Sequence, residues 1–158
     1  MASNERGNVH FIREVAVRYV GRSTRVEPAI RRPTEAVDFM RRVVRDDARE
    51  HFVALYLDGR HQPIAHQIVS IGTASSALVH PREVFQPAIL VGACATIVGH
   101  NHPSGDPVPS AEDRQVARRL SQAGVLLGVR VLDALVWTRH GVFVSIQELE
   151  PGLLEASS

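Results

Sequence analysis

The chain has 158 residues, of which 44% are hydrophobic and 22% charged, and its net charge is +1. This size and composition are typical of one soluble globular domain, and the longest apolar stretch, residues 88–98, is too short to span a membrane. The N-terminus also lacks the apolar core of a signal peptide. The single cysteine, Cys94, lies inside the apolar stretch, so we predict a buried thiol and a cytoplasmic location.

The first part of the chain predicts a tail, a strand and a helix. After a loose tail over residues 1–8, alternating apolar residues indicate a strand over residues 10–20. A polar connector follows. Apolar residues at helical spacing then predict a helix over residues 34–48, preceded by a proline, with Thr34 as its N-cap.

The middle of the chain predicts a hairpin, a helix and a buried strand. Residues 51–57 and 64–72 have the pattern of two strands joined by a turn over residues 58–63. A helix is predicted over residues 81–94, although Pro87 would interrupt or kink it. Residues 95–100 form a short apolar run of the β-branched type, which predicts a buried strand.

The last part of the chain predicts one helix and two strands. Residues 110–128 carry a strong amphipathic pattern, and apolar strands follow at residues 129–137 and 141–146. The whole order is β-α-β-β-α-β-α-β-β. It predicts a mixed α/β fold with helices packed on a central sheet.

The strongest chemical signal is HNHPSGDPVPSAED at residues 100–113. In an extended chain, residues i and i+2 point to the same side, so His100 and His102 can direct both imidazoles at one point. Asp113 follows eleven residues after His102, in the first turn of the predicted helix, and a loop that folds back would bring its carboxylate to the same point. Two imidazoles and one carboxylate suit zinc and leave a fourth position open, as in catalytic zinc sites.

Each part of this pattern also has a simpler explanation. Ser110-x-x-Asp113 is typical of a capped helix N-terminus, and H-x-H alone is a weak signal. The combination is stronger because each part needs the geometry of the others. The two interpretations are also compatible, since a capped helix would hold Asp113 rigidly.

The pattern H-x-H-x7-S-x-x-D resembles the JAMM signature of MPN+ (JAB) metalloproteases. The strings VSIGTASSALVHPREVF and GHNHPSGDPVPSAED are similar to the RadC family of bacterial proteins, in its short form without an N-terminal helix-hairpin-helix region. The resemblance implies an MPN/JAB (cytidine-deaminase-like) fold, a mixed β-sheet flanked by helices in a single domain. We assign residues 31–158 to that domain and residues 1–30 to an N-terminal tail and strand.

The resemblance also implies a function and its residues. His100, His102 and Asp113 would bind one Zn²⁺ per chain, with water as the fourth ligand. Glu50 would take a proton from that water and pass it to the leaving amine, and Ser110 would donate a hydrogen bond to the oxyanion. The expected activity is zinc-dependent hydrolysis of a peptide or isopeptide bond in an unidentified peptide or protein substrate. One departure from the family is Ala134, which follows Asp133 where RadC proteins commonly have histidine.

The distribution of arginine leaves other functions open. Residues 1–49 hold 11 arginines against 7 acidic residues, a balance of +4, whereas residues 50–158 hold 7 against 10, a balance of −3. The alternative is therefore a DNA-repair or mobile-element-associated DNA-binding module with a structural or regulatory metal site. A solvated helix face explains the same arginines, and we expect any nucleic-acid binding to be weak. A metal-dependent nuclease fits less well, because such sites are rich in carboxylates and commonly hold two metal ions. The oligomeric state is left open.

Overall fold

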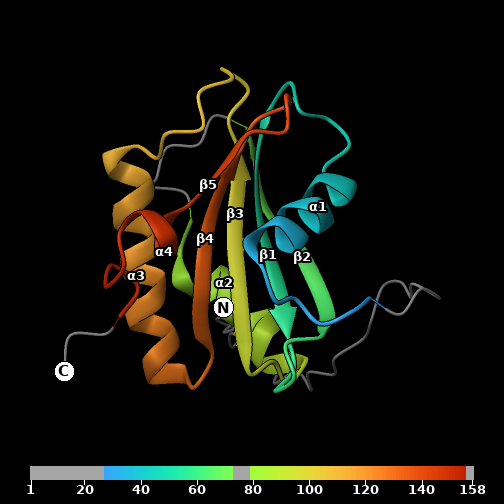
Figure 1. The fold of residues 1–158 in the computed structure, drawn as a ribbon. Helices are drawn as coiled ribbons and strands as arrows, with labels where there is room; N and C mark the ends of the chain where they lie inside the picture. The colour runs from blue at the N-terminus through green and yellow to red at the C-terminus, as the bar shows by residue number, and fades with distance from the viewer. Residues whose placement is uncertain (1–26, 73–78, 156–158) are drawn as a thin grey trace, which may run out of the picture.

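The computed structural model describes residues 27–72 and 79–155, which form a five-stranded sheet with helices packed on it (Figure 1). The elements are α1 (Pro33–Val43), β1 (Glu50–Leu57), β2 (Pro63–Gly72), α2 (Pro81–Leu90), β3 (Ala95–Asn101), α3 (Ala111–Leu127), β4 (Arg130–Trp137), β5 (Phe143–Ser145) and α4 (Ile146–Leu149). The predicted mixed α/β fold is confirmed. The short helix α4 was not predicted, and the strand predicted over residues 10–20 lies outside the described residues.

The sheet has the strand order β2-β1-β3-β4-β5. All neighbours are antiparallel except β3 and β4, which are parallel and are connected through α3. Because β1 and β3 run in opposite directions, the first residues of β1 lie beside the last residues of β3. The last pair in their ladder is Phe52 opposite His100.

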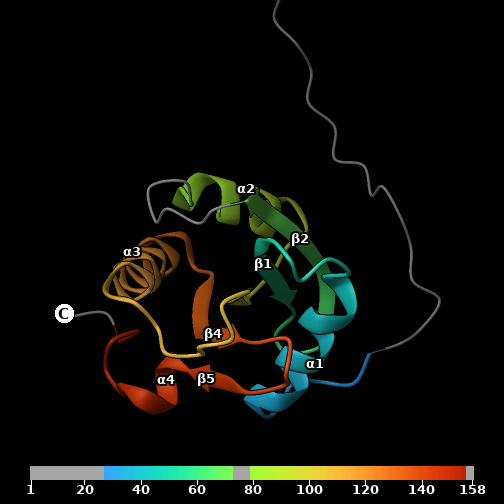
Figure 2. The same ribbon diagram turned by 90° about the horizontal axis from the view of Figure 1, so that it is seen from above.

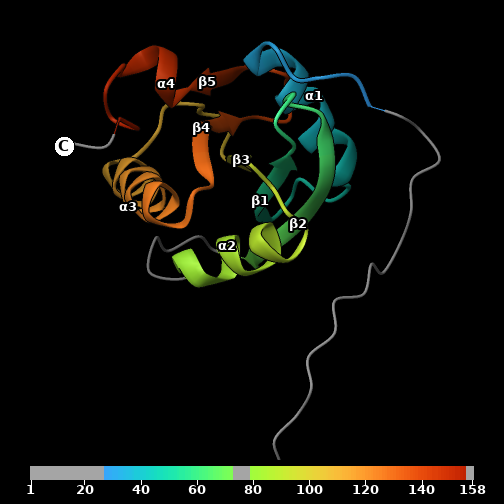
Figure 3. The ribbon, with the colours of Figure 1, turned by 90° about the horizontal axis from the view of Figure 1, so that it is seen from below.

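Helices cover both faces of the sheet (Figures 2 and 3). On one face, Phe52 and Val98 pack in a core cluster with Phe85 of α2 and Leu120 of α3. On the other face, Leu55 and other strand residues pack against α1. Burial on both sides explains why β1 is an almost continuous hydrophobic run rather than an alternating one. None of the helices in the described ranges has the length and apolar character that a membrane span requires.

The start of α1 differs from the prediction. Arg32 occupies the N-cap position and Pro33 is the first helical residue, so the prediction of Thr34 as N-cap is wrong. Proline suits this position because its missing N–H would have no partner in the helix. The Glu35 carboxylate instead accepts the backbone N–H groups of Arg31 and Arg32, at 2.7 and 3.0 Å.

Cys94 is exposed, so the prediction of a buried thiol is wrong. Helix α2 continues through Pro87 but ends at Leu90, four residues before the predicted end, and the chain then turns into β3. The Cys94 backbone is hydrogen-bonded to β1 and to β4. Its N–H donates to the Leu57 carbonyl at 2.9 Å, and its carbonyl accepts the Arg130 N–H at 3.3 Å. The backbone is therefore held at the edge of the core while the thiol faces outward.

Gly99 lets β3 lie close to its neighbours just before His100, near the end of the strand. A Cβ at this position would lie 2.8 Å from the Leu135 carbonyl oxygen and 3.0 Å from both Met40 Sδ and Trp137 Cζ3. The Leu135 carbonyl of β4 and the side chains of Met40 and Trp137 therefore occupy the space that a side chain at residue 99 would need. This close approach sets the distance of β3 from β4 and from α1, and therefore the position of His100, the next residue of the strand.

We expect Gly99→Ala to lower the free energy of unfolding by about 1–3 kcal/mol, because the Leu135 carbonyl cannot move without disturbing the β3–β4 ladder. Urea denaturation measures this change. Gly59→Ala is the matched control: its Cβ would meet only Cys94 Sγ, at 3.8 Å, and we expect a change within about 0.5 kcal/mol. Equal losses in the two variants would contradict the close packing at Gly99.

Candidate metal centre

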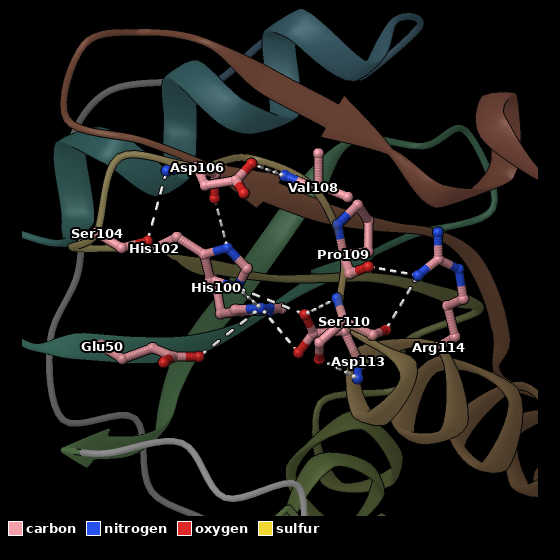
Figure 4. A network of polar contacts seen from close by, with 10 residues as sticks. All are labelled: Glu50, His100, His102, Ser104, Asp106, Val108, Pro109, Ser110, Asp113 and Arg114. Atoms are coloured by element: carbon pink, nitrogen blue, oxygen red, sulfur yellow. Dashed lines mark hydrogen bonds and ion pairs between the residues drawn. The ribbon is translucent and has the colours of Figure 1, made fainter.

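The two histidines of the H-x-H pattern come together at the end of β3 (Figure 4). Their Nε2 atoms are 3.0 Å apart, as the alternation of a strand predicts. His102 Nδ1 lies 2.7 Å from the Asp106 carbonyl oxygen. A carbonyl can only accept, so Nδ1 carries a proton, and in the neutral imidazole the lone pair is then on Nε2, which faces His100. The His100 ring is buried and stacks parallel to Phe52, with 6.0 Å between ring centroids.

Asp113 reaches both imidazoles from the first turn of α3. Its Oδ1 lies 3.1 Å from His100 Nε2, and its Oδ2 lies 3.4 Å from His102 Nε2. Oδ2 also accepts the Ser110 backbone N–H at 2.7 Å, while Ser110 Oγ accepts the Asp113 N–H at 3.1 Å. Ser110 is therefore the N-cap of α3, as its sequence pattern predicts.

The electrostatics of Asp113 follow from these contacts. Burial opposes its ionisation, but hydrogen bonds from His100, His102 and the Ser110 backbone outweigh that effect and hold the pKa of the carboxyl well below its usual value. The same pairing raises the pKa of His102, against the opposing effect of burial. The centre therefore contains a carboxylate that stays ionised at neutral pH.

Glu50 stands beside this group at the start of β1. Its Oε1 lies 3.7 Å from His100 Nε2, and its side chain is 19% exposed. The ligand atoms of Glu50, His100 and His102 lie within 4.8 Å of one another, so these three residues form a group that can hold a metal ion. His51 is the next residue of β1, so its side chain points to the opposite face of the sheet. Its backbone N–H donates to Asn101 Oδ1.

The donor set fits zinc. Ligand bonds of about 2.0–2.1 Å in a tetrahedron place ligand atoms roughly 3.3 Å apart. The separations among His100, His102 and Asp113 are 3.0, 3.1 and 3.4 Å, whereas the Glu50 contact is longer, at 3.7 Å, and reaches one imidazole. The structure thus brings all five predicted site residues together, and two carboxylates adjoin the pair of imidazoles.

Sequence reasoning missed Asn101, which lies between the two histidines but faces the other side of the sheet. Its side-chain amide is almost fully buried and spans Glu50: Oδ1 accepts the His51 N–H at 2.7 Å, and Nδ2 donates to the Arg49 carbonyl at 2.9 Å. These bonds continue the β1–β3 pairing where the ladder ends. The strand that carries the histidines therefore also fixes the backbone on both sides of Glu50. The sequence did place this amide directly after a strand predicted to be buried, and a buried amide needs hydrogen-bond partners.

The loop between β3 and α3 is held by its own polar groups. Asp106 Oδ1 accepts the Val108 N–H at 3.0 Å, and Ser104 Oγ accepts the Asp106 N–H at 3.4 Å. The Arg114 guanidinium donates to the Pro109 carbonyl and pairs with Glu150. These contacts bring the Asp106 carbonyl to His102 and the helix N-terminus to the end of β3.

A family model described as the RadC-like JAB domain matches residues 30–152. The chain belongs to this family. It is 44% identical over 122 residues to a UPF0758 protein from Trichlorobacter lovleyi, covering 77% of this chain and 52% of that protein. A UPF0758 protein from Shouchella clausii is 42% identical over 132 residues, covering 83% and 57%. The chain thus spans about half the length of these relatives. The predicted resemblance to RadC is confirmed, and the observed five-stranded sheet flanked by helices is consistent with a JAB fold.

We expect Asn101→Ala to lower the free energy of unfolding by roughly 1–3 kcal/mol, because it leaves the His51 N–H buried without an acceptor. The Arg49 carbonyl would keep its contact with His51 Nδ1, at 2.9 Å. Thermal or urea unfolding of the metal-free protein measures the change. Gln122→Ala removes an exposed amide and serves as the control. A loss no larger than in this control would show that Asn101 does not anchor β1.

Proposed function

We propose that this RadC-like JAB domain is a zinc-dependent metallohydrolase that cleaves a peptide or isopeptide bond. The observation that carries the proposal is the arrangement of two carboxylates around two imidazoles. The Asp113 carboxylate contacts Nε2 of both histidines, whereas Glu50 lies beside His100 at a longer distance. This difference in distance supports Asp113 as a metal ligand and Glu50 as a general base.

In this proposal His100, His102 and Asp113 hold the zinc ion. When bound, zinc would lower the pKa of a water molecule to about 7 and polarise the scissile carbonyl. The Asp106 carbonyl orients His102 for this role through Nδ1. The Ser110 N–H and the N-terminus of α3 keep Asp113 ionised and correctly placed.

Glu50 and Ser110 would carry out the remaining steps. Glu50 lies beside His100 and would take the proton from the attacking water, then deliver it to the amine that leaves. Ser110 Oγ accepts the Asp113 N–H through its oxygen, so its own hydrogen remains available. That hydrogen would be donated to the carbonyl oxygen as it becomes negatively charged.

The DNA-binding alternative receives less support from the described residues. Arginines in the segment before β1 form ion pairs with nearby carboxylates: Arg32 with Glu35, Arg42 with Glu27, and Arg49 with Asp46. Neutralised arginines contribute less to phosphate binding, which depends on the number of unpaired positive charges. A purely structural metal site would also have no need for a second carboxylate beside the ligands.

We expect the purified protein to hold about one zinc per chain. His100→Ala and Asp113→Ala should each lose most of it, because each removes one of three ligands. Elemental analysis after zinc-replete purification measures the content. His140→Ala changes an exposed histidine and should retain the metal. Little metal in the wild type, with no change in either ligand variant, would contradict the ligand assignment.

We expect Glu50→Gln to keep its zinc and to hydrolyse peptides roughly 10²–10⁴-fold more slowly, since glutamine cannot take a proton. Ser110→Ala should also keep zinc, lose about 10²–10³-fold in rate, and lose about 1 kcal/mol of stability with the helix cap. Mass spectrometry of a peptide library, with zinc measured in the same samples, provides the readout. If Glu50→Gln released the zinc, Glu50 would be a ligand and the proposed division of the carboxylates would be wrong.

A further inference from the structure

A small apolar cavity of about 30 Å³ lies directly against the metal centre. Glu50, His100 and Asp113 line it on one side. The remaining side chains in contact with it are hydrophobic, among them Phe52, Val98, Val116, Ala117, Ala134 and Ile146. The cavity therefore joins the polar centre to the core between the sheet and α3.

The periodicity of the elements explains this position. Phe52 follows Glu50 by two residues on β1, and Val98 precedes His100 by two on β3, so each pair lies on one face of the sheet. On α3, Val116 and Ala117 follow Asp113 by three and four residues and share its helical face. Each of the three centre residues that line the cavity thus has an apolar neighbour on the same face, and these neighbours form part of its walls.

The volume and chemistry of the cavity favour an aliphatic occupant over water. One water needs about 10–15 Å³ of such space and two to four polar partners, and the walls away from the centre offer none from their side chains. The cavity instead has room for about two carbon atoms. We propose that it receives a small aliphatic side chain of the substrate residue next to the scissile bond, in the size range from alanine to valine.

This inference rests on the proposed function, because it requires the scissile bond to lie at the metal centre. It assigns specificity to Ala134, whose small side chain leaves the cavity open beside His100 and Asp113. Valine at this position would add two methyl groups, about the volume available. A larger residue at position 134 should therefore keep the substrate side chain out of the cavity. A substrate side chain larger than valine should be too large to enter it.

The cavity can be tested without a substrate. Alkyl hydroxamates of increasing chain length, from acetohydroxamate to hexanohydroxamate, would be titrated into the zinc-loaded full chain by calorimetry. We expect the affinity to rise about fourfold for each added carbon over roughly the first two carbons, and no further for longer chains. In Ala134→Val this gain should disappear, while acetohydroxamate should still bind.

Ala54→Val is the matched control, because Ala54 belongs to the same buried cluster but does not line the cavity. In the metal-free protein, Ala134→Val should leave the thermal midpoint unchanged or raise it, whereas Ala54→Val should lower it by overpacking. If Ala54→Val does not fold, Ala123→Val replaces it in the hydroxamate titration, since Ala123 is only partly buried and also lies outside the cavity.

The outcomes separate the two proposals. No hydroxamate binding at any length would contradict the metal centre, and the inference with it. Binding that is independent of chain length, or an undiminished gain in Ala134→Val, would contradict the subsite alone and leave the metal centre standing. An equal fall in the thermal midpoint for Ala134→Val and Ala54→Val would show that residue 134 has no free space beside it.

Discussion

The contact on which the rest of the centre depends is the Asp113 carboxylate shared between His100 and His102. It joins the first turn of α3 to the end of β3, two elements that are separated by a proline-rich loop. The Ser110 cap holds the carboxylate from the helix side, and the Asp106 carbonyl holds His102 from the loop side. Because a buried carboxylate without such partners would be costly, helix, loop and strand must adopt their positions together.

Strand β3 uses its two faces for different purposes. His100 and His102 direct their imidazoles to the side covered by α3, where the candidate metal centre lies. Gly99 and Asn101 face the side of α1: Gly99 permits close packing, and Asn101 anchors the backbone around Glu50. One strand therefore carries the histidines and also fixes the carboxylate that stands opposite them. A shift of one residue in its register would exchange the two sets and destroy both.

Hydrophobic side chains pack directly beneath the polar centre. Phe52, Val98 and Val116 place apolar side chains beneath the imidazoles and carboxylates, so the charges there interact in a medium less polarisable than water. This surrounding strengthens every hydrogen bond to Asp113 and makes its ionised state depend on those bonds. It also means that a substrate held at the centre would meet hydrophobic surface on that side.

The sequence alone determined the features that depend on neighbours along the chain. Strand and helix periods predicted most elements, the H-x-H spacing predicted converging imidazoles, and S-x-x-D predicted the cap of α3. The resemblance to RadC indicated Glu50. The tertiary structure decided what depends on distant segments: the amide of Asn101 against residues fifty positions away, the outward turn at Cys94, and the cavity beside Ala134. Periodicity reports which face a side chain occupies, but only the packed chain determines what it meets there.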